Sequence, residues 1–583
     1  MKTVLLLSAA IFAASTAFAA DNTAPDEKAA LAALNAELPS LWDYSAIAKE
    51  PLDATIVSST THNGWKSESV YINGVGGASG TDRIFFYYAH PEKPEGKIPA
   101  VIDITGGSVD DTRAVYLGKV LNGACVVMEW RCNAAKLRSQ WVGGIPKYRV
   151  VGPLKTDESY RVITGARRVL DFLSQQDYID PARLGCMGGS MGGIYTMLLS
   201  GVDPRVSAGV VDVGVGHLAH SDCLQGGFWL SPERKDIWLK AFDPYSHANA
   251  IKARSIVLPS SDDHFCALGD IVETYKAIPS EKRLCIDPNY DHSTPAFGGP
   301  EPHYPGLNQW LPYCFGQTDS YIKIPDQLDA DGDTCSLPTN GQDIKDAWLW
   351  FSPGPRDLIW QARYWVPVKA EVKDGKCVAK VPVRYAKLLR YYFMDVYNSK
   401  GQKASTLPAF KDGPVASYAP PILWENNQLW DVASGLGAWR PLVTIGDVPR
   451  VANLRIVPPF GIAIGPAATV ANHKFVILTS SIGLVSAAAQ KHGGLAFKID
   501  GNGAPGELKL ALFVNFNSAF NEQKFEYTLK YGKDIQTYSI PWKDFTNTKS
   551  PAASIFPFDT LRIEGVREDG TQITIHEIAF ADP

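Results

Sequence analysis

The stretch Leu184-Gly-Cys-Met-Gly-Gly-Ser190-Met-Gly-Gly-Ile-Tyr-Thr-Met-Leu-Leu199 decides the fold. Its first residues have the composition of a buried strand, and residues 194–199 form an apolar helical run. Between them lies a match to the pattern G-x-S-x-G, in which a serine stands on a tight turn from a strand into a helix. The neighbours two positions away must be small for steric reasons, and the next helix N-terminus presents amides to a developing negative charge. The stretch predicts that Ser190 is a catalytic nucleophile; the alternative is a glycine-rich helix start without chemistry.

Strands and helices alternate on both sides of this turn. Residues 157–175 keep apolar side chains three and four positions apart, as expected for a helix with Thr156 as its N-cap. Residues 101–104 are almost wholly apolar, which is typical of a strand buried on both faces. The strand candidates are residues 67–72, 83–88, 98–105, 125–130, 184–187, 207–213, 255–259 and 283–287. This alternation predicts a mostly parallel sheet that helices cover on both faces.

A serine hydroxyl is a poor nucleophile unless a base removes its proton. In folds that carry G-x-S-x-G, an acid and then a histidine follow the serine along the chain. Asp263 comes just after the strand candidate at 255–259, and His292 comes just after the one at 283–287. Both residues fall at strand carboxyl ends, the edge of a parallel sheet where sites form. We expect Ser190, Asp263 and His292 to form a catalytic triad.

Other residues near this edge keep alternatives open. Asp262 is adjacent to Asp263, and Asp212 ends the preceding strand, where some hydrolases carry the acid. His264 and His303 are further histidines near the same edge. The position after the last strand favours His292, and the sequence favours Asp263 as its partner.

A developing oxyanion needs two backbone donors. One is expected to be the amide of Met191, directly after the nucleophile. The other is expected from the loop Thr105-Gly-Gly107-Ser108, where the Gly107 N–H is favoured and an ordinary Gly-Gly turn is the alternative. Such chemistry requires neither a metal nor an organic cofactor. The cysteines include no C-x-x-C, and no His pair stands near them at zinc-ligand spacing.

Residues 40–318 resemble an α/β-hydrolase. Their sequence pattern is most similar to that of the branch that contains dienelactone hydrolases, acetylxylan esterases and prolyl-oligopeptidase-like enzymes. The resemblance is carried by Asp180-Pro-Ala-Arg-Leu184 before the serine turn, by Phe242-Asp-Pro-Tyr245 and by Pro288-Asn-Tyr-Asp-His-Ser293. It implies a Ser-His-Asp mechanism with an acyl-enzyme intermediate. One departure concerns the oxyanion loop, where many relatives have His-Gly and this chain has Thr105-Gly106.

The rest of the chain has a different sequence pattern. After residue 318, short alternating runs separated by turn signals predict all-β structure. Residues 319–415 resemble the Ig-like β-sandwich attached to some hydrolases. Residues 416–583 resemble galactose-binding-like jelly rolls, among them carbohydrate-binding modules, through Tyr538-Ser-Ile-Pro-Trp-Lys-Asp-Phe545 and Phe558-Asp-Thr-Leu-Arg562. The expected organisation places a signal peptide at 1–19 and the α/β-hydrolase domain at 20–318, before these two β domains.

The N-terminus has the pattern of a secretory signal, with Lys2, an apolar run over residues 4–14 and the cleavage site Ala17-Phe-Ala19. The alternative is a membrane anchor, but spanning a bilayer takes about 20 residues. We expect a secreted or periplasmic monomer, in a compartment that permits disulfides among its nine cysteines. The formal net charge is −5, from 56 basic and 61 acidic residues, and gives no reason to expect nucleic acid or a membrane as a partner.

The expected substrate is an acylated carbohydrate, such as an acetylated or feruloylated polysaccharide. Aromatic rings that stack on sugar or aryl groups are expected in loops after sheet strands, and the candidates are Trp130, Trp141, Trp229 and Trp238. Core packing is the alternative for each of them. Acetyl, feruloyl and synthetic aryl esters stay open as substrates. The rival functions are a serine peptidase of the prolyl-oligopeptidase type, which usually has a large β domain before the hydrolase domain, and a carbohydrate-adhesion protein with an inactive hydrolase domain.

Overall fold

The structure is a computed structural model of the chain. It describes residues 24–77, 80–104, 110–130, 137–142, 152–214, 216–220, 231–263, 265–288, 290, 292, 306–353, 356, 360, 363, 365–382, 389–411, 428–431, 440–441, 452–457, 461–466, 474–479, 489–514, 522–567 and 572–581. The expected signal peptide at 1–19 lies outside this set. Within it, no helix is both long and apolar enough to cross a membrane.

A large sheet dominates the first half of the chain. Its strands are β1 (Thr55–His62), β2 (Trp65–Gly77), β3 (Gly80–Pro91), β4 (Ile98–Asp103), β5 (Ala124–Glu129), β6 (Ile179–Gly189), β7 (Val206–Asp212), β8 (Arg254–Leu258) and β9 (Lys282–Leu284). They run in the order β1-β2-β3-β5-β4-β6-β7-β8-β9. Strand β4 pairs in parallel with β5 and β6, and β6 pairs in parallel with β7, while β1, β2 and β3 pair antiparallel. Every residue of β4 and β5 is buried, as expected for a covered parallel sheet.

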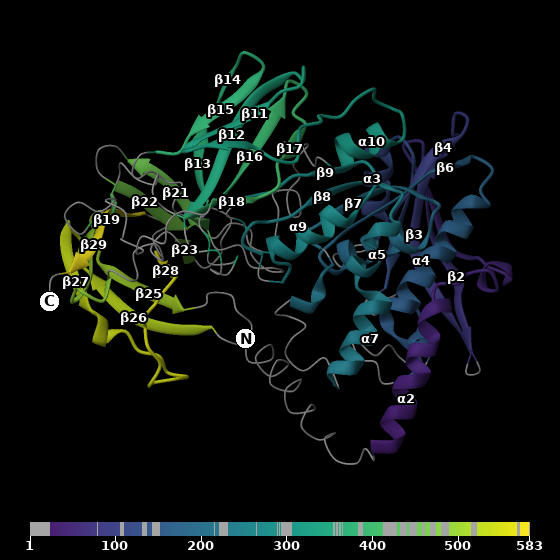
Figure 1. The fold of residues 1–583 in the computed structure, drawn as a ribbon, viewed down its shortest axis with the longest axis horizontal. Coiled ribbons are helices and arrows are strands. Elements are labelled where there is room, and N and C mark those ends of the chain that lie inside the picture. The colour runs from purple at the N-terminus through teal and green to yellow at the C-terminus, as the bar shows by residue number, and fades with distance from the viewer. Residues whose placement is uncertain are drawn as a thin grey trace. The chain divides into compact units, whose positions relative to one another are not determined.

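Helices lie against this sheet (Figure 1). The α-helices are α2 (Ala24–Glu37), α3 (Asp111–Leu121), α4 (Glu158–Ser174), α5 (Met191–Val202), α7 (Pro232–Phe242), α8 (Pro244–His247), α9 (Leu268–Ala277) and α10 (Leu311–Cys314). Helix α3 contacts β3 and β5, α4 contacts β2, and α5 contacts β6 and β7. The alternation of strands and helices predicted from the sequence is therefore confirmed for these elements.

Helix α4 matches the helix predicted at 157–175, but its N-cap differs. The Asp157 carboxylate accepts the Ser159 N–H at 2.8 Å and caps the helix. The prediction that Thr156 is the cap was wrong, because Thr156 ends the preceding 3₁₀ turn, η3 (Leu154–Thr156), and its hydroxyl donates to the Pro153 carbonyl at 2.7 Å. A carboxylate at this position also has a favourable interaction with the helix dipole.

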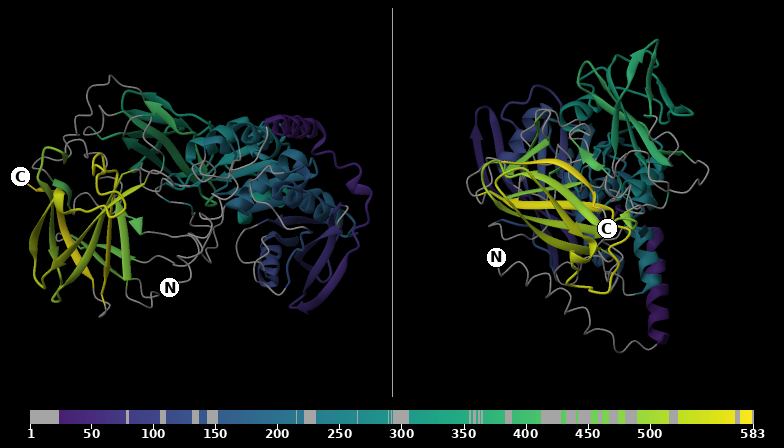
Figure 2. Two further views of the ribbon diagram at one scale, coloured as in Figure 1. Left: turned by 90° about the horizontal axis from the view of Figure 1, so that it is seen from below. Right: turned by 90° about the vertical axis from the view of Figure 1, so that its left-hand side faces the viewer.

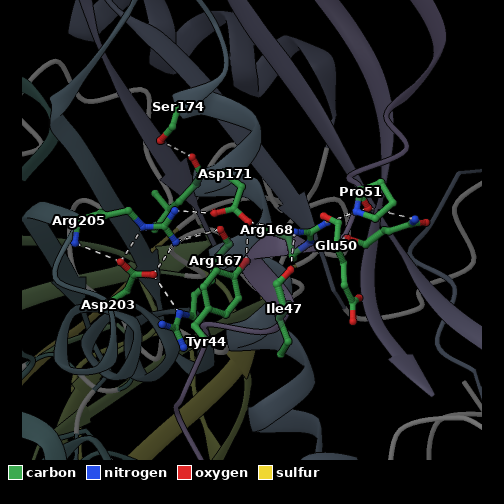
Figure 3. Close-up of polar contacts among 12 residues, drawn as sticks. Tyr44, Ile47, Glu50, Pro51, Arg167, Arg168, Asp171, Ser174, Asp203 and Arg205 are labelled. Atoms are coloured by element: carbon green, nitrogen blue, oxygen red, sulfur yellow. Dashed lines mark hydrogen bonds and ion pairs between the residues drawn. The ribbon is translucent and has the colours of Figure 1, made fainter.

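A buried arginine of α4 fastens the segment before β1 (Figure 3). The Arg168 side chain is 1% exposed and donates to the carbonyls of Ile47, Glu50 and Pro51 at 3.0, 2.9 and 2.9 Å. It also donates to the Asp171 carboxylate at 3.1 Å. A buried guanidinium is tolerated only when its donors are satisfied, so these contacts fix the path of a segment with little regular structure.

The second half of the chain is rich in strands. They are β10 (Asp329–Asp331), β11 (Thr334–Pro338), β12 (Ile344–Pro353), β13 (Val366–Lys369), β14 (Glu371–Lys373), β15 (Lys376–Lys380), β16 (Arg390–Asn398), β17 (Lys403–Ser405), β18 (Ala409–Lys411), β19 (Gln428–Asp431), β20 (Arg440–Pro441), β21 (Ala452–Val457), β22 (Gly461–Pro466), β23 (Lys474–Thr479), β24 (Gly494–Asp500), β25 (Gly506–Val514), β26 (Gln523–Tyr531), β27 (Gln536–Pro541), β28 (Thr560–Val566) and β29 (Ile573–Ala581). The first group forms the sheets β10-β11-β15-β14 and β13-β12-β16-β17, with β18 paired to β16. The prediction of β structure after residue 318 is confirmed for these strands.

The last group of strands encloses one hydrophobic core. Its two sheets have the orders β21-β22-β29-β24-β27 and β20-β23-β28-β25-β26. Leu495 and Phe497 of β24 share a buried cluster with Leu510 and Leu512 of β25, so side chains from both sheets fill the same interior. Figure 2 shows the last strands of the chain as yellow-green and yellow ribbons near the C-terminus. This is the packing of a β-sandwich.

Contacts divide the chain into two units. The first comprises Met1–Ser255 and Glu273–Glu281, and the second comprises Ile256–Val272 and Lys282–Pro583. The expected disulfides are not seen among the described cysteines. The structure shows no disulfide at any of these cysteines, which are Cys125, Cys186, Cys266, Cys285, Cys314, Cys335 and Cys377. Cys132 and Cys223 lie outside the described residues.

Candidate active site

Ser190 occupies a strained turn between β6 and α5. Its φ of 59° and ψ of −126° are unusual for a residue with a side chain. The turn is held by backbone hydrogen bonds, since the Ser190 N–H donates to the Asp212 carbonyl at 2.9 Å. The N–H groups of Gly193 and Ile194 donate to the Ser190 carbonyl at 2.9 and 3.1 Å. Strain of this kind costs on the order of 1–3 kcal/mol and persists only where the surroundings enforce it. The conformation is the one that the G-x-S-x-G pattern predicts.

Glycines make this turn possible by close backbone approach. A Cβ on Gly188 would lie 2.5 Å from the Gly192 carbonyl oxygen, and one on Gly193 would lie 2.9 Å from the Asp212 carbonyl oxygen. Gly214 is equally constrained, because a Cβ there would lie 2.4 Å from the Ser190 carbonyl oxygen. Gly214 was missed by the sequence reasoning, which used only the glycines next to the serine.

Asp263 and His292 form a buried pair. The His292 Nδ1 lies 2.9 Å from Oδ1 and 2.8 Å from Oδ2 of Asp263. The Asp263 Oδ1 also accepts the N–H groups of Phe265 and Cys266 at 2.8 and 2.9 Å. This carboxylate is thus fixed by the backbone of its own loop, and its contact with Nδ1 leaves Nε2 of the imidazole to act on a second group.

The structure distinguishes Asp263 from the other acids near this edge. The Asp262 Oδ1 accepts the Ser261 hydroxyl at 2.7 Å. Asp212 is connected to the serine turn through its backbone, since its carbonyl accepts the Ser190 N–H. Asp263 is the acid whose carboxylate oxygens lie within hydrogen-bond distance of His292 Nδ1. His264 and His303 lie outside the described residues.

The loops that carry the acid and the histidine are joined by backbone hydrogen bonds. The Ser261 N–H donates to the Asp287 carbonyl at 3.0 Å, and the Asp262 N–H donates to the Tyr290 carbonyl at 3.0 Å. Ser260 and Asp287 also form a parallel bridge. The distance between Asp263 and His292 is therefore set by two adjacent chain segments and not by the two side chains alone.

Phe265 is a site residue that sequence reasoning missed. Its ring meets the His292 imidazole edge to face, with 4.8 Å between the ring centroids, and the residue is 36% exposed. A half-exposed aromatic ring beside a buried histidine has the geometry of a wall of a binding site. The only signal in the sequence was an aromatic residue two positions after the acid.

The two expected oxyanion donors have different outcomes. Met191 is the first residue of α5, so its amide belongs to the first turn of that helix. Gly107 and the rest of its loop lie outside the described residues.

The expected substrate-stacking tryptophans that the structure describes lie in the interior. The Trp130 ring packs edge to face against Tyr195, and its Nε1 donates to the Ile104 carbonyl at 3.3 Å. Trp141 is buried, and its ring lies 5.5 Å from the Arg161 guanidinium. Trp238 is 1% exposed. These positions correct the expectation of exposed stacking rings in favour of core packing, while Trp229 lies outside the described residues.

One group of side chains near this pair could hold a metal ion. Asp263, Cys266 and His292 each offer a ligand atom, all within 4.8 Å of one another, and no other group of this kind occurs in the described part of the chain. Two of the three residues already face each other in the carboxylate–imidazole hydrogen bond.

Comparisons with known proteins find that two family models each match part of the chain. The model of the Acetyl xylan esterase (AXE1) family matches residues 41–219, and that of the Prolyl oligopeptidase family matches residues 160–301. Ser190 lies in both spans, while Asp263 and His292 lie in the second. No curated protein matches the sequence.

Several solved structures are similar to part of the chain. An acetyl xylan esterase from Paenibacillus sp. R4 is 20% identical, with a TM-score of 0.39, over 44% of this chain and 90% of that chain. Acetyl Xylan Esterase 1 from Thermoanaerobacterium sp. JW/SL YS485 is 20% identical, with a TM-score of 0.37, over 44% and 89% of the two chains. An S-formylglutathione hydrolase from Agrobacterium tumefaciens is 16% identical, with a TM-score of 0.32, over 41% and 92%.

The serine turn on a parallel sheet, the buried Asp–His pair and the two family matches indicate the same class of enzyme. The chain is therefore a serine hydrolase whose site is carried by a sheet that helices cover.

Proposed function

We propose that this enzyme is an exported esterase that removes acyl groups, acetyl above all, from a polysaccharide such as xylan. The observation that carries the proposal is the conformation of Ser190, held at positive φ at the start of a helix inside the span that matches the acetyl xylan esterase family. Packing alone gives no reason for a serine to be held in this strained conformation, whereas acyl transfer does.

The proposed triad is Ser190, His292 and Asp263. These residues follow β6, β9 and β8, three strands of one sheet. Strand carboxyl ends in such sheets face a common edge, where sites form. The order serine, acid, histidine along the chain is the one that accompanies the G-x-S-x-G pattern, and it supports the proposal that the three residues act together.

The reaction then proceeds in two halves. Ser190 Oγ attacks the ester carbonyl while His292 Nε2 takes its proton, and the imidazolium returns that proton to the leaving sugar hydroxyl. Water attacks the acyl-enzyme with the same histidine as base, which releases the carboxylic acid. Asp263 holds Nδ1–H of His292 and stabilises the imidazolium.

The proposed oxyanion hole uses the Met191 amide and a second amide, for which Gly107 remains the candidate. A donor aimed at the developing negative charge contributes about 100- to 1000-fold in kcat. The Met191 amide lies at the N-terminus of α5, where the helix dipole adds to its effect.

The direct test compares serine variants of α5 and its cap. Ser190→Ala is expected to abolish hydrolysis of p-nitrophenyl acetate and acetate release from acetylated xylan, with an unchanged circular dichroism spectrum. Ser200→Ala is the matched control, because Ser200 is a buried serine of the same helix whose hydroxyl donates to the Thr196 carbonyl at 2.8 Å. Full activity of the Ser190 variant would overturn the assignment.

A serine peptidase is the second candidate, because the Prolyl oligopeptidase family matches the span that contains all three triad candidates. Assays with proline-containing peptides separate the two functions. Deacylation of xylan without peptide cleavage supports the esterase, and the reverse result supports the peptidase. A panel of acetyl, feruloyl and aryl esters then identifies the preferred acyl group.

Export and carbohydrate binding belong to the same proposal. Cleavage after Ala19 would give a mature N-terminus at Ala20, which N-terminal sequencing of the secreted protein can verify. Residues 416–583 are proposed to bind the polysaccharide. Loss of retention on insoluble xylan, when the full chain is compared with one ending near residue 415, would support that role.

A further inference from the structure

Lys403 is a buried lysine on β17, a strand of the sheet that contains β16. Its side chain is only 9% exposed, and its ammonium lies between two carboxylates. The distances are 3.1 Å to Asp287 Oδ1 and 3.2 Å to Asp395 Oδ2. Burial by itself would lower the pKa of Lys403, but the carboxylates of Asp395 and Asp287 raise it well above its usual value. The lysine is therefore charged throughout the working range of an esterase.

The ammonium connects this strand to the segment that leads into His292. It donates to the Ile286 carbonyl and forms its ion pair with Asp287, the next residue along that segment. The Cys285 thiol donates to the Lys403 carbonyl at 3.1 Å. Three consecutive residues after β9 are thus attached to one residue of β17.

Ser405 adds a second connection between the same two segments. Its hydroxyl accepts the Ile286 N–H at 2.8 Å and donates to Asp395 Oδ1. Asp395 lies on β16 and is fully buried, and burial raises its pKa to about 6. The Asp395 carboxylate thus contacts both Lys403 and Ser405, and each of these two residues is hydrogen-bonded to the backbone of Ile286.

The attached segment continues directly into the candidate site. The Asp287 N–H donates to the Pro259 carbonyl at 2.8 Å, and its carbonyl accepts the Ser261 N–H. Asp287 thus lies between Lys403 on one side and the loop that carries Asp263 on the other. A displacement of Asp287 moves the acid loop and the histidine loop relative to each other.

We propose that Lys403 is a positioning residue for His292, so that the β17 strand after the hydrolase core forms part of the catalytic machinery. The proposal rests on the proposed esterase function. Burying an ion pair usually gains little stability, and a hydrophobic residue of similar volume often serves as well. We therefore explain the buried charge of Lys403 by the contacts that it makes. Its ammonium binds Ile286, Asp287 and Asp395, and these contacts fix the backbone at residues 286 and 287.

The test measures turnover per active site in Lys403→Met. We expect kcat per fluorophosphonate-titrated site to fall about 10- to 100-fold with KM unchanged, because small displacements of a catalytic base have effects of this size. Lys403→Arg, which keeps the charge, should retain more activity than Lys403→Met.

Two further variants keep the test decisive. If Lys403→Met does not fold, Ser405→Ala removes the Ile286 contact without removing a charge and should lower kcat in the same direction. Lys369→Met is the matched control, because the Lys369 ammonium pairs with Asp346 in the same sheet and is largely exposed. It should leave kcat and KM unchanged.

The outcome is separable from that of the proposed function. Wild-type kcat per titrated site in folded Lys403→Met or Ser405→Ala would overturn the proposal, even if melting temperatures fall. Retained activity of Ser190→Ala would instead overturn the esterase assignment, whatever the Lys403 variants do.

Discussion

At the scale of single residues, Gly188 leaves no room for a side chain beside the serine turn. A Cβ at this position would lie 2.5 Å from the Gly192 carbonyl oxygen, so the turn must shift to admit it. We predict that Gly188→Ala lowers kcat for p-nitrophenyl acetate by about 100-fold or more, because the Ser190 hydroxyl moves with the turn. Steady-state kinetics on folded protein measures the effect.

Gly209→Ala is the control for that variant. A Cβ on this buried glycine of β7 would meet the hydroxyls of Ser200 and Ser255 at 3.5 Å, an ordinary contact distance. Its kcat should stay near that of the wild type. Similar kcat values for the Gly188 and Gly209 variants would show that the serine turn tolerates a side chain.

Phe265 is predicted to contact the substrate. Its ring packs on His292 and the residue is 36% exposed, so we expect substrate bound near the imidazole to contact it. Phe265→Ala should raise KM for acetylated xylo-oligosaccharides about 3- to 10-fold, the size expected for one aromatic contact. Phe265→Tyr keeps the ring and should restore KM. An unchanged KM in the alanine variant would place the substrate elsewhere.

At the scale of elements, the cap of α4 makes stability depend on pH. Burial raises the pKa of Asp157 to about 7, although its hydrogen bonds with Ser159 lower it, whereas an unfolded aspartate has a pKa of about 3.9. The folded state thus binds the proton more tightly, and the stabilisation is complete below pH 3.9 and is lost as pH rises through 7. Asn at this position caps the helix without titrating.

The corresponding measurement is thermal unfolding of wild type and Asp157→Asn at pH 5 and pH 8. The wild type should lose melting temperature between these pH values, and the variant should lose less. An equal loss in both proteins would show that Asp157 does not titrate in this range.

At the scale of the whole molecule, the sequence predicted those site residues whose chemical role requires a recognisable pattern of neighbouring residues. The serine turn needs small neighbours in fixed positions, so Ser190 could be found from its surroundings in the chain. Asp263 and His292 could be named because strand ends are visible in the sequence, and the structure places these two side chains in contact. The alternation of apolar strands and helices likewise predicted the parallel pairing of β4 with β5 and β6 and of β6 with β7. The strands predicted at 67–72 and 83–88 belong to β2 and β3, which pair antiparallel.

Features that depend on contacts between distant segments could not be predicted. Nothing local distinguishes Lys403, which meets Asp287 only after the chain has folded. The prediction that tryptophans stack on the substrate was wrong for a related reason. An aromatic ring after a strand suits a binding site and a core equally well. Trp238 packs against Phe242 inside its own unit, and only the fold decides that.

The central claim is that Ser190 is a nucleophile activated by the Asp263–His292 pair. The most direct measurement is the rate at which a fluorophosphonate labels Ser190, followed by peptide mass spectrometry, in wild type and His292→Ala. The account predicts a single adduct on Ser190 that forms about 1000-fold or more slowly in the variant, because the base that activates the hydroxyl is gone. Equal labelling rates in the two proteins, or an adduct on another residue, would contradict it.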